Sequence, residues 1–205
     1  LISSLYMIVI LTQCFPSRFG GIESLISNLS INLGKKKDVT VLADSYNNIL
    51  DTNFDKKHSK IIKVHRIKGI KFYRQRKKIF EFKKIIKSNK VELVIADTWK
   101  SLELCIKYIN NNNLPTICLA HGNELLSKNI RKKQRINFTL DQVSAVVANS
   151  KYTCNLVKKI IPTKKNITFV YPGAEDLRKE KSKNFIKIDG GPILITLARL
   201  EKRKG

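Results

Sequence analysis

The fold class follows from MIVILT at residues 7–12, an amphipathic run at residues 22–33 and VTVLA at residues 39–43. The first and third segments are short continuous apolar runs, which are typical of buried parallel strands. The middle segment repeats apolar residues at helical spacing, namely Ile22, Leu25, Ile26, Leu29 and Leu33. We expect this helix to end at Gly34, a residue type that is frequent at helix C-termini. The three segments together predict a strand, a helix and a second strand.

The same alternation continues along the chain. Further strands are predicted at residues 61–67, 91–96, 115–120, 145–148 and 167–170. Further helices are predicted at residues 73–87, 101–109, 129–140 and 152–161, and residues 44–60 are expected to form a polar loop. Parallel neighbours need a crossover connection, so strands separated by helices predict an α/β fold with a parallel sheet and helices on both faces.

A second domain is expected to begin near the end of the sequence. Gly190, Gly191 and Pro192 indicate a boundary, and residues 193–197 form one more apolar run, which needs a sheet of its own. Residue 1 is a leucine, so Met7 is a candidate start. We therefore expect an upstream extension at residues 1–6, a first domain at residues 7–175, a linker at residues 176–192, and the first strand and turn of a truncated second domain at residues 193–205.

The composition is strongly basic. Forty Lys and Arg against 16 Asp and Glu give a net charge of +24, which favours phosphates, polyanions or acidic membranes. Coding bias explains the charge equally well, because Lys, Asn and Ile are over-used together. No apolar run approaches the ~18 residues of a membrane span. The four cysteines have no metal-like or C-x-x-C spacing, so we expect a reduced cytoplasmic compartment and no bound metal.

Ligands of parallel sheets bind beyond the carboxyl ends of the strands, so the residues that follow each strand are the candidate site. Gly20 and Gly21 follow the first strand and begin a helix, where exposed N–H groups suit a phosphate; a simple tight turn is the alternative. The sequence contains no G-x-G-x-x-G and no G-x-x-x-x-G-K-[ST], which is evidence against a dinucleotide oxidoreductase and a P-loop NTPase.

Polar residues also follow two later strands. His121, with Glu124 close behind it, is placed to bond or exchange a proton with a sugar hydroxyl, or is an ordinary turn histidine. Asn149 and Ser150 either line the same crevice or only cap a helix.

The final residues of the chain are basic. Arg199 and Lys204 follow the last predicted strand, where they would clamp a diphosphate with a guanidinium fork and a point charge. A solvated basic turn is the alternative interpretation of this segment.

The ordered set TQCFPSRFGGIESLISNLS, LAHGNE, VVANSKYTCNLV, ITFVYPGAE and ILITLARLEKRKG resembles the retaining glycosyltransferases of family four, which have the two-domain GT-B fold. The resemblance covers nearly the whole chain after Met7. It implies that the first domain is Rossmann-like and binds the acceptor, and that the second binds the donor nucleotide. It also implies transfer from a nucleotide-sugar donor to a glycan or lipid-linked acceptor in polysaccharide or cell-envelope synthesis, with retention and without a cofactor or metal.

The resemblance assigns roles to particular residues. Gly20 and Gly21 match the loop near the donor diphosphate, and His121 matches the histidine near the transferred sugar. Arg199 and Lys204 match the pair that neutralises the leaving diphosphate, which is an expected catalytic contribution. The family's E-x7-E glutamate pair lies downstream of the Lys–Gly step and is missing here, and Ala198 replaces a frequent glycine. We therefore expect the 205-residue chain alone to have no useful transferase activity.

Other function classes stay open. The basic aromatic stretch at residues 71–90 has the composition of a helix that lies on an anionic membrane, which suits a peripheral protein at the inner membrane face. A non-catalytic basic module that binds an acceptor glycan, a membrane surface or another polyanion is the main alternative, and a sugar-nucleotide epimerase of similar architecture is another. A nucleic-acid-binding domain would suit the basic charge, but no helix-turn-helix, zinc, RNP or KH pattern is present, so we expect no nucleic-acid partner.

Overall fold

The computed structural model describes residues 6–173 and 190–192 of the chain. The chain divides into two units, residues 1–172 and 173–205, and the helices and strands below belong to the first. The predicted connection at residues 176–187 and the predicted strand at residues 193–197 lie outside the described residues.

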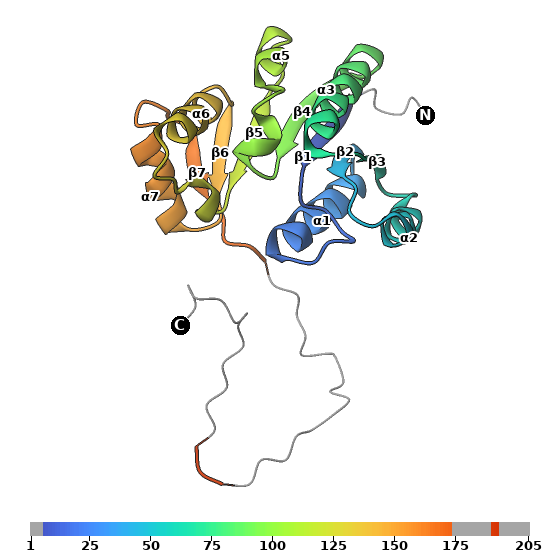
Figure 1. The fold of residues 1–205 in the computed structure, drawn as a ribbon, viewed down its shortest axis with the longest axis horizontal. Helices are drawn as coiled ribbons and strands as arrows, with labels where there is room; N and C mark the ends of the chain where they lie inside the picture. The colour runs from blue at the N-terminus through green and yellow to red at the C-terminus, as the bar shows by residue number, and fades with distance from the viewer. Residues whose placement is uncertain (1–5, 174–189, 193–205) are drawn as a thin grey trace. The chain divides into compact units, whose positions relative to one another are not determined.

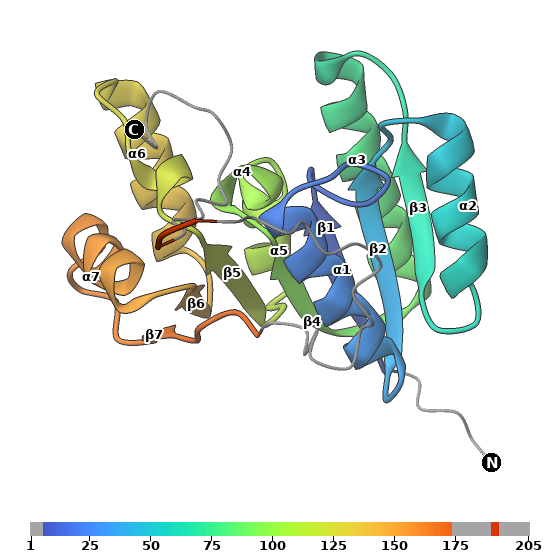
Figure 2. The same ribbon diagram turned by 90° about the horizontal axis from the view of Figure 1, so that it is seen from below.

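A parallel sheet of seven strands forms the centre of the first unit, and its order is β3-β2-β1-β4-β5-β6-β7 (Figures 1 and 2). The strands are β1 Tyr6–Thr12, β2 Asp38–Asp44, β3 Lys63–Ile67, β4 Lys90–Ala96, β5 Thr116–Ala120, β6 Ala145–Ala148 and β7 Ile167–Phe169. In the middle of the sheet, Ile10 of β1 pairs with Val41 on one side and with Ile95 on the other. The predicted parallel α/β fold is confirmed.

Helices cover both faces of this sheet. One face packs against α1 (Gly21–Gly34) and α2 (Asn48–His58), and the other against α3 (Lys71–Ser88), α4 (Trp99–Leu102), α5 (Ile106–Asn111), η1 (Asn123–Leu125), α6 (Ile130–Asp141) and α7 (Lys151–Ile160). Side chains that alternate along β1 enter the two cores. Ile10 packs with Ile26 of α1, whereas Leu11 packs in the core that contains Phe82 of α3.

The strand order reverses between β1 and β4. The chain moves outward from β1 through β2 to β3, then returns to β4 and moves the other way (Figure 2). In parallel sheets the crevice at such a switch point, beyond the carboxyl ends of the strands, is the usual ligand site. The loop after β1 and the residues after β4 therefore border the candidate site.

Two predicted elements were wrong. The polar loop expected at residues 44–60 contains α2, because the Asn47 side chain caps the helix by accepting hydrogen bonds from the Ile49 and Leu50 amides at 3.1 Å and Phe54 packs against the core. The helix expected at residues 101–109 is broken into α4 and α5, since the Cys105 amide bonds to the Leu102 carbonyl in a tight turn. The apolar spacing indicated which side chains are buried and not whether the helical hydrogen bonds are continuous.

Gly34 is the last residue of α1, as predicted, but a close contact explains the glycine. A Cβ atom there would lie 2.5 Å from the Ile61 carbonyl oxygen. The helix end therefore packs directly on the backbone that leads into β3.

Candidate functional site

The loop between β1 and α1 ends at the predicted diglycine. Gly20 is the N-cap of α1, in extended backbone, and Gly21 is its first residue. A Cβ atom on Gly21 would meet nothing within 4 Å, so its backbone is open to an approaching group. A Cβ atom on Gly20 would overlap the carboxylate of Glu23.

Glu23 occupies the helix end where a donor phosphate was predicted. Its side chain is buried, and Oε1 lies 3.1 Å from Nε of Arg18. The positive end of the helix dipole therefore already faces a carboxylate, which the dipole stabilises. A phosphate at Gly20 and Gly21 would have to share or displace this carboxylate, so their predicted role in donor binding remains a prediction.

Asp97 lies at the switch point, directly after β4, and is fully buried. Its Oδ2 accepts hydrogen bonds from Thr12 Oγ1 at 2.7 Å and from the Gln13 amide at 3.2 Å, and its Oδ1 accepts one from Ser101 Oγ at 2.5 Å. Burial raises the pKa of this carboxyl, and the hydrogen bonds from Ser101 and Thr12 offset only part of that effect. Asp97 thus ties the loop after β1 to the start of α4.

His121 follows β5 and is half-buried. Its Nε2 lies 2.8 Å from the backbone carbonyl oxygen of Asp97, the residue that directly follows the neighbouring strand β4. A carbonyl oxygen only accepts hydrogen bonds, so Nε2 carries a proton in this contact. When the ring is neutral, Nδ1 is then the nitrogen that can accept from a ligand.

Glu124 is turned back onto the backbone beside His121. Its Oε1 accepts hydrogen bonds from the His121 amide at 2.7 Å and from the Gly122 amide at 3.4 Å. Gly122 has a φ of 104°, which L side chains rarely adopt, so a glycine is required at this turn. Glu124 therefore holds the turn that presents His121.

Asn149 and Ser150 follow β6. Ser150 is the N-cap of α7, with Oγ accepting from the Thr153 amide at 3.2 Å, as the capping interpretation predicted. The Asn149 side chain donates to the His121 carbonyl at 3.4 Å, and its Oδ1 is buried without a hydrogen-bond partner. This oxygen is enclosed by the protein, so it is an unpaired buried acceptor beside the His121 turn.

The structure brings His121, Glu124 and Asn149 together with Asp97. No hydrogen bond or ion pair within residues 6–173 links Gly20 or Gly21 to this group. Arg199 and Lys204, the predicted diphosphate clamp, lie outside the described residues. Among the described residues, no group of three His, Cys, Asp or Glu side chains is arranged to hold a metal ion.

Sequence reasoning missed Asp97. The signal was available, because Asp97 directly follows a predicted strand, the same position that singled out His121 and Asn149. It also missed Asp51 of α2, which contacts the loop between β1 and α1 at Ser17. Asp51 accepts hydrogen bonds from Ser17 and Ser45 and lies 3.6 Å from the Arg66 guanidinium, so it fixes that loop against α2 and β3.

The family model described as Glycosyltransferase Family 4 matches residues 19–176, which include both the diglycine and the His121 turn. The chain belongs to this glycosyltransferase family. The predicted resemblance to family four is therefore confirmed. No curated protein matches the chain in sequence.

Solved structures with the GT-B architecture share the fold. They include HepE from Anabaena in complex with UDP, at 15% identity and a TM-score of 0.59, which covers 82% of this chain and 44% of that chain. The lipopolysaccharide outer core galactosyltransferase WaaB, at 18% identity and a TM-score of 0.56, covers 80% and 45%. UDP-GlcNAc 2-epimerase from Methanocaldococcus jannaschii, at 16% identity and a TM-score of 0.55, also covers 80% and 45%. The chain spans less than half the length of these proteins.

Proposed function

We propose that the chain forms the acceptor-side domain of a retaining glycosyltransferase, which transfers a sugar from a nucleotide-sugar donor to a glycan or lipid-linked acceptor. Family membership supports this proposal, and so do the structural neighbours that contain bound UDP or UDP-glucose. The observation that carries it is the placement of His121 beside Asp97, Glu124 and Asn149. His121 is held at Nε2 by the Asp97 carbonyl oxygen, which leaves Nδ1 as the ring nitrogen that has no hydrogen bond among the described residues and can accept one from a sugar.

The chemistry follows from this placement. In retaining transfer the acceptor hydroxyl attacks the sugar carbon on the face from which the diphosphate leaves, and the developing negative charge on the phosphate must be stabilised. We assign hydroxyl positioning to His121, with Asn149 as its neighbour, and charge stabilisation to Arg199 and Lys204. Gly20 and Gly21 would let the diphosphate approach the backbone.

The proposal is tested with the product of the whole gene. Thermal-shift titration with UDP-, GDP- and ADP-sugars should show stabilisation by one nucleotide class, because a ligand that binds only the folded state raises its stability. The double variant Arg199→Ala/Lys204→Ala should lose that stabilisation, whereas Arg131→Ala/Lys107→Ala, which removes two exposed charges elsewhere, should keep it. Equal shifts in both variants would contradict the clamp.

Transfer itself needs a separate measurement. Release of the nucleoside diphosphate should depend on an added acceptor, and the anomeric configuration of the product, read by NMR, should equal that of the donor. Epimerisation of the donor sugar without an acceptor would instead favour the function of the epimerases that share this fold.

An anionic membrane surface is a second proposed partner, carried by α3. Phe72, Tyr73 and Phe80 are each more than half exposed on this helix, and Arg76 stacks at 4.1 Å on the Phe72 ring. The basic residues on the same side of the helix are Lys77, Lys83, Lys84 and Lys87. Exposed aromatic rings between cations match the composition of helices that lie in a membrane interface. No helix within the described part of the chain has the length and hydrophobicity to cross a bilayer.

Liposome sedimentation tests this partner. Vesicles of phosphatidylcholine with phosphatidylglycerol should carry the protein down, and Phe72→Ser/Phe80→Ser should reduce the bound fraction severalfold at constant charge. Binding that is unchanged in this variant would show that charge alone is responsible. Absence of binding at any salt concentration would remove the membrane from the proposal.

A further inference from the structure

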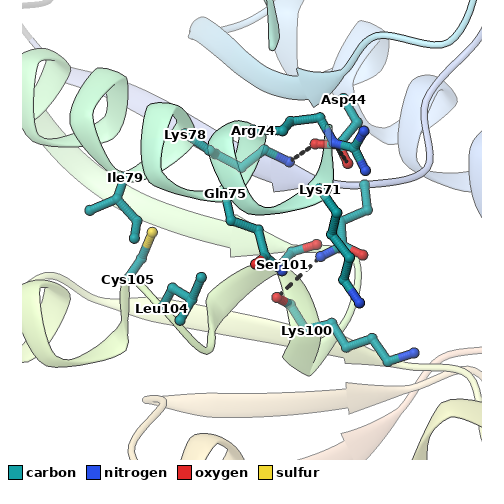
Figure 3. Close-up of a pocket in the computed structure, with 11 residues that line it drawn as sticks. Asp44, Lys71, Arg74, Gln75, Lys78, Ile79, Lys100, Ser101, Leu104 and Cys105 are labelled. Carbon is teal, nitrogen blue, oxygen red and sulfur yellow. Dashed lines mark hydrogen bonds and ion pairs between the residues drawn. The ribbon is translucent and has the colours of Figure 1, made fainter. Parts of the chain in front are cut away.

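A cation-lined pocket lies at the carboxyl edge of the sheet, between α3 and α4 (Figure 3). Four of its lining side chains are cationic, and Asp44 is its one carboxylate; the cations are Lys71, Arg74, Lys78 and Lys100. The loop after β1 adds Gln13, whose Nε2 donates to the Lys100 carbonyl at 3.3 Å. The pocket therefore borders the switch point, where ligands of such sheets bind.

Two of the four cations have internal partners. The amino group of Lys78 is buried and lies 2.5 Å from Asp44 Oδ1 and 2.7 Å from the Thr12 carbonyl oxygen. Nε of Arg74 lies 2.8 Å from Asp44 Oδ2. Asp44 is thus already neutralised by two cations that the fold holds in place. Its negative charge therefore does not balance the other two cations of the pocket.

The other two cations are free within the described part of the chain. Lys71, from the start of α3, and Lys100, from α4, make no hydrogen bond through their amino groups and no ion pair there, although Lys100 also lies 5.9 Å from the Trp99 ring. Figure 3 shows both side chains at the charged end of the pocket, away from Ile79 and Cys105. Cations that lie together without anions repel one another, so this pocket is suited to an anion that approaches from solvent.

Hydrogen bonds link the pocket lining to His121 through Asp97. Ser101 lines the pocket and donates to the Asp97 carboxylate, while the Asp97 carbonyl oxygen bonds to His121. An anion held by Lys71 and Lys100 would therefore be linked to the proposed transfer site through Ser101 and Asp97. That is the place for a charged group carried by the acceptor.

We propose that this pocket binds a phosphate group of the acceptor, with Lys71 and Lys100 as its ligands and the Asp44-bound guanidinium of Arg74 beside them. The inference rests on the proposed function, because it specifies the acceptor class as phosphorylated. Ammonium and guanidinium groups form charge-assisted hydrogen bonds to phosphate oxygens, and Gln75 adds an amide donor to the lining. A phosphorylated sugar and a lipid headgroup present the same chemistry to the pocket.

The test is binding of small probes to the 205-residue chain, measured by calorimetry near physiological salt. Glucose 1-phosphate should bind and glucose should not. Lys71→Gln/Lys100→Gln should weaken glucose 1-phosphate binding about tenfold or more, since two charge-assisted contacts are lost. The matched control, Lys107→Gln/Lys158→Gln, removes the same charge from exposed positions on α5 and α7 and should change affinity less than about twofold.

Side-chain amide NMR signals of Gln13 and Gln75 locate the probe, because both residues line the pocket. These signals should shift with glucose 1-phosphate in the parent chain and in the control pair. The site would be overturned if both double variants weakened glucose 1-phosphate binding equally, or if glucose 1-phosphate bound without shifting these signals. Tighter binding of UDP, weakened by the same pocket pair, would also overturn it, because the pocket would then belong to the donor.

Vesicles distinguish the source of the phosphate. Phosphatidylcholine vesicles with and without phosphatidic acid are compared in the parent chain and the pocket pair. If glucose 1-phosphate binds and the variant Lys71→Gln/Lys100→Gln leaves vesicle binding unaltered, the site belongs to a soluble phosphorylated acceptor. If the variant weakens vesicle binding, the site belongs to a lipid headgroup. If the pocket binds phosphate but the whole gene product transfers no sugar, the site stands and the proposed function fails. If the whole gene product transfers sugar and the variant Lys71→Gln/Lys100→Gln transfers it equally well, the phosphate site is overturned and the proposed function stands.

Discussion

The imidazole Nε2 of His121 lies 2.8 Å from the backbone carbonyl oxygen of Asp97, and this contact joins the ends of β5 and β4. The Asp97 carboxylate is bound at the same time to Thr12 at the end of β1. Three neighbouring strand ends are therefore fixed to one another through one residue. The histidine that a ligand would meet is held in one orientation before the ligand arrives, which lowers the entropic cost of positioning it.

Substitutions of His121 separate anchoring from chemistry. His121→Gln keeps an amide donor near the ε position and should leave the melting temperature nearly unchanged. His121→Asn leaves the Asp97 carbonyl without its partner and should cost about 1 kcal/mol of unfolding free energy. Both remove the imidazole and should lower the turnover of the whole gene product about 100-fold or more. Full turnover in the Gln variant would show that His121 is only a turn residue.

The stability of the fold should fall in acid because of Asp51. Burial alone would raise the pKa of this carboxyl, but hydrogen bonds from Ser17, Ser45 and the Tyr46 amide outweigh burial and lower it below 3.8. The folded state then binds fewer protons than the unfolded state, so this contribution is present above the unfolded pKa and is lost as the pH falls through the folded pKa. Urea unfolding at pH 7 and near pH 3 measures the difference.

Asp51→Asn is the matched variant for that measurement. An amide keeps the shape but offers one acceptor oxygen in place of two, so at pH 7 it should lose about 1–3 kcal/mol of unfolding free energy. Its stability should then change less between pH 7 and pH 3 than that of the parent chain. An equal pH dependence in both chains would assign the acid sensitivity to other carboxyl groups.

Cys14 should be an unreactive thiol although it lies on the loop that leads to the diglycine. Burial, which has the largest effect, and the Asp97 and Glu23 carboxylates together raise the pKa of this thiol to about 11. At pH 8 only about one molecule in a thousand carries the thiolate, which is the nucleophilic form. Alkylation by iodoacetamide, followed by mass spectrometry, should be about 100-fold slower in the native chain than in urea. Rapid native alkylation would show that the loop opens.

The sheet could be predicted from the sequence because buried strands leave continuous apolar runs. Strands β1, β2, β5 and β6 lie on such runs, whereas the edge strand β3 is half polar; the polar residues after β5 and β6 lie at the carboxyl edge as expected. Helix α2 was missed because its buried side chains include Asp51, which a hydrophobic pattern does not register. Asn47, a residue type that is frequent at helix N-caps, was the one remaining indication that a helix begins there.

The pocket between α3 and α4 could not be predicted. Lys78 appears in the sequence as one lysine among many, and only the fold shows that it is buried against Asp44. Glu23 is a similar case, because an acidic residue in a first helical turn is ordinarily exposed. In both cases the missing information is which distant residue faces the charge, and that depends on the packing of helices against the sheet.

Alanine substitutions at the two glycines that begin α1 should have opposite effects on the stability of the fold. Gly21→Ala places a methyl group in open space and should stabilise the fold by up to about 1 kcal/mol, because alanine favours the helix. Gly20→Ala displaces the Glu23 carboxylate from the helix end and disturbs its ion pair with Arg18, so it should lower the melting temperature. If a donor diphosphate approaches this backbone, Gly21→Ala in the whole gene product should weaken nucleotide-sugar binding about tenfold while the fold becomes no less stable. Thermal unfolding and calorimetric titration of the same two variants measure both effects, and unchanged donor affinity in Gly21→Ala would leave the diglycine with a purely structural role.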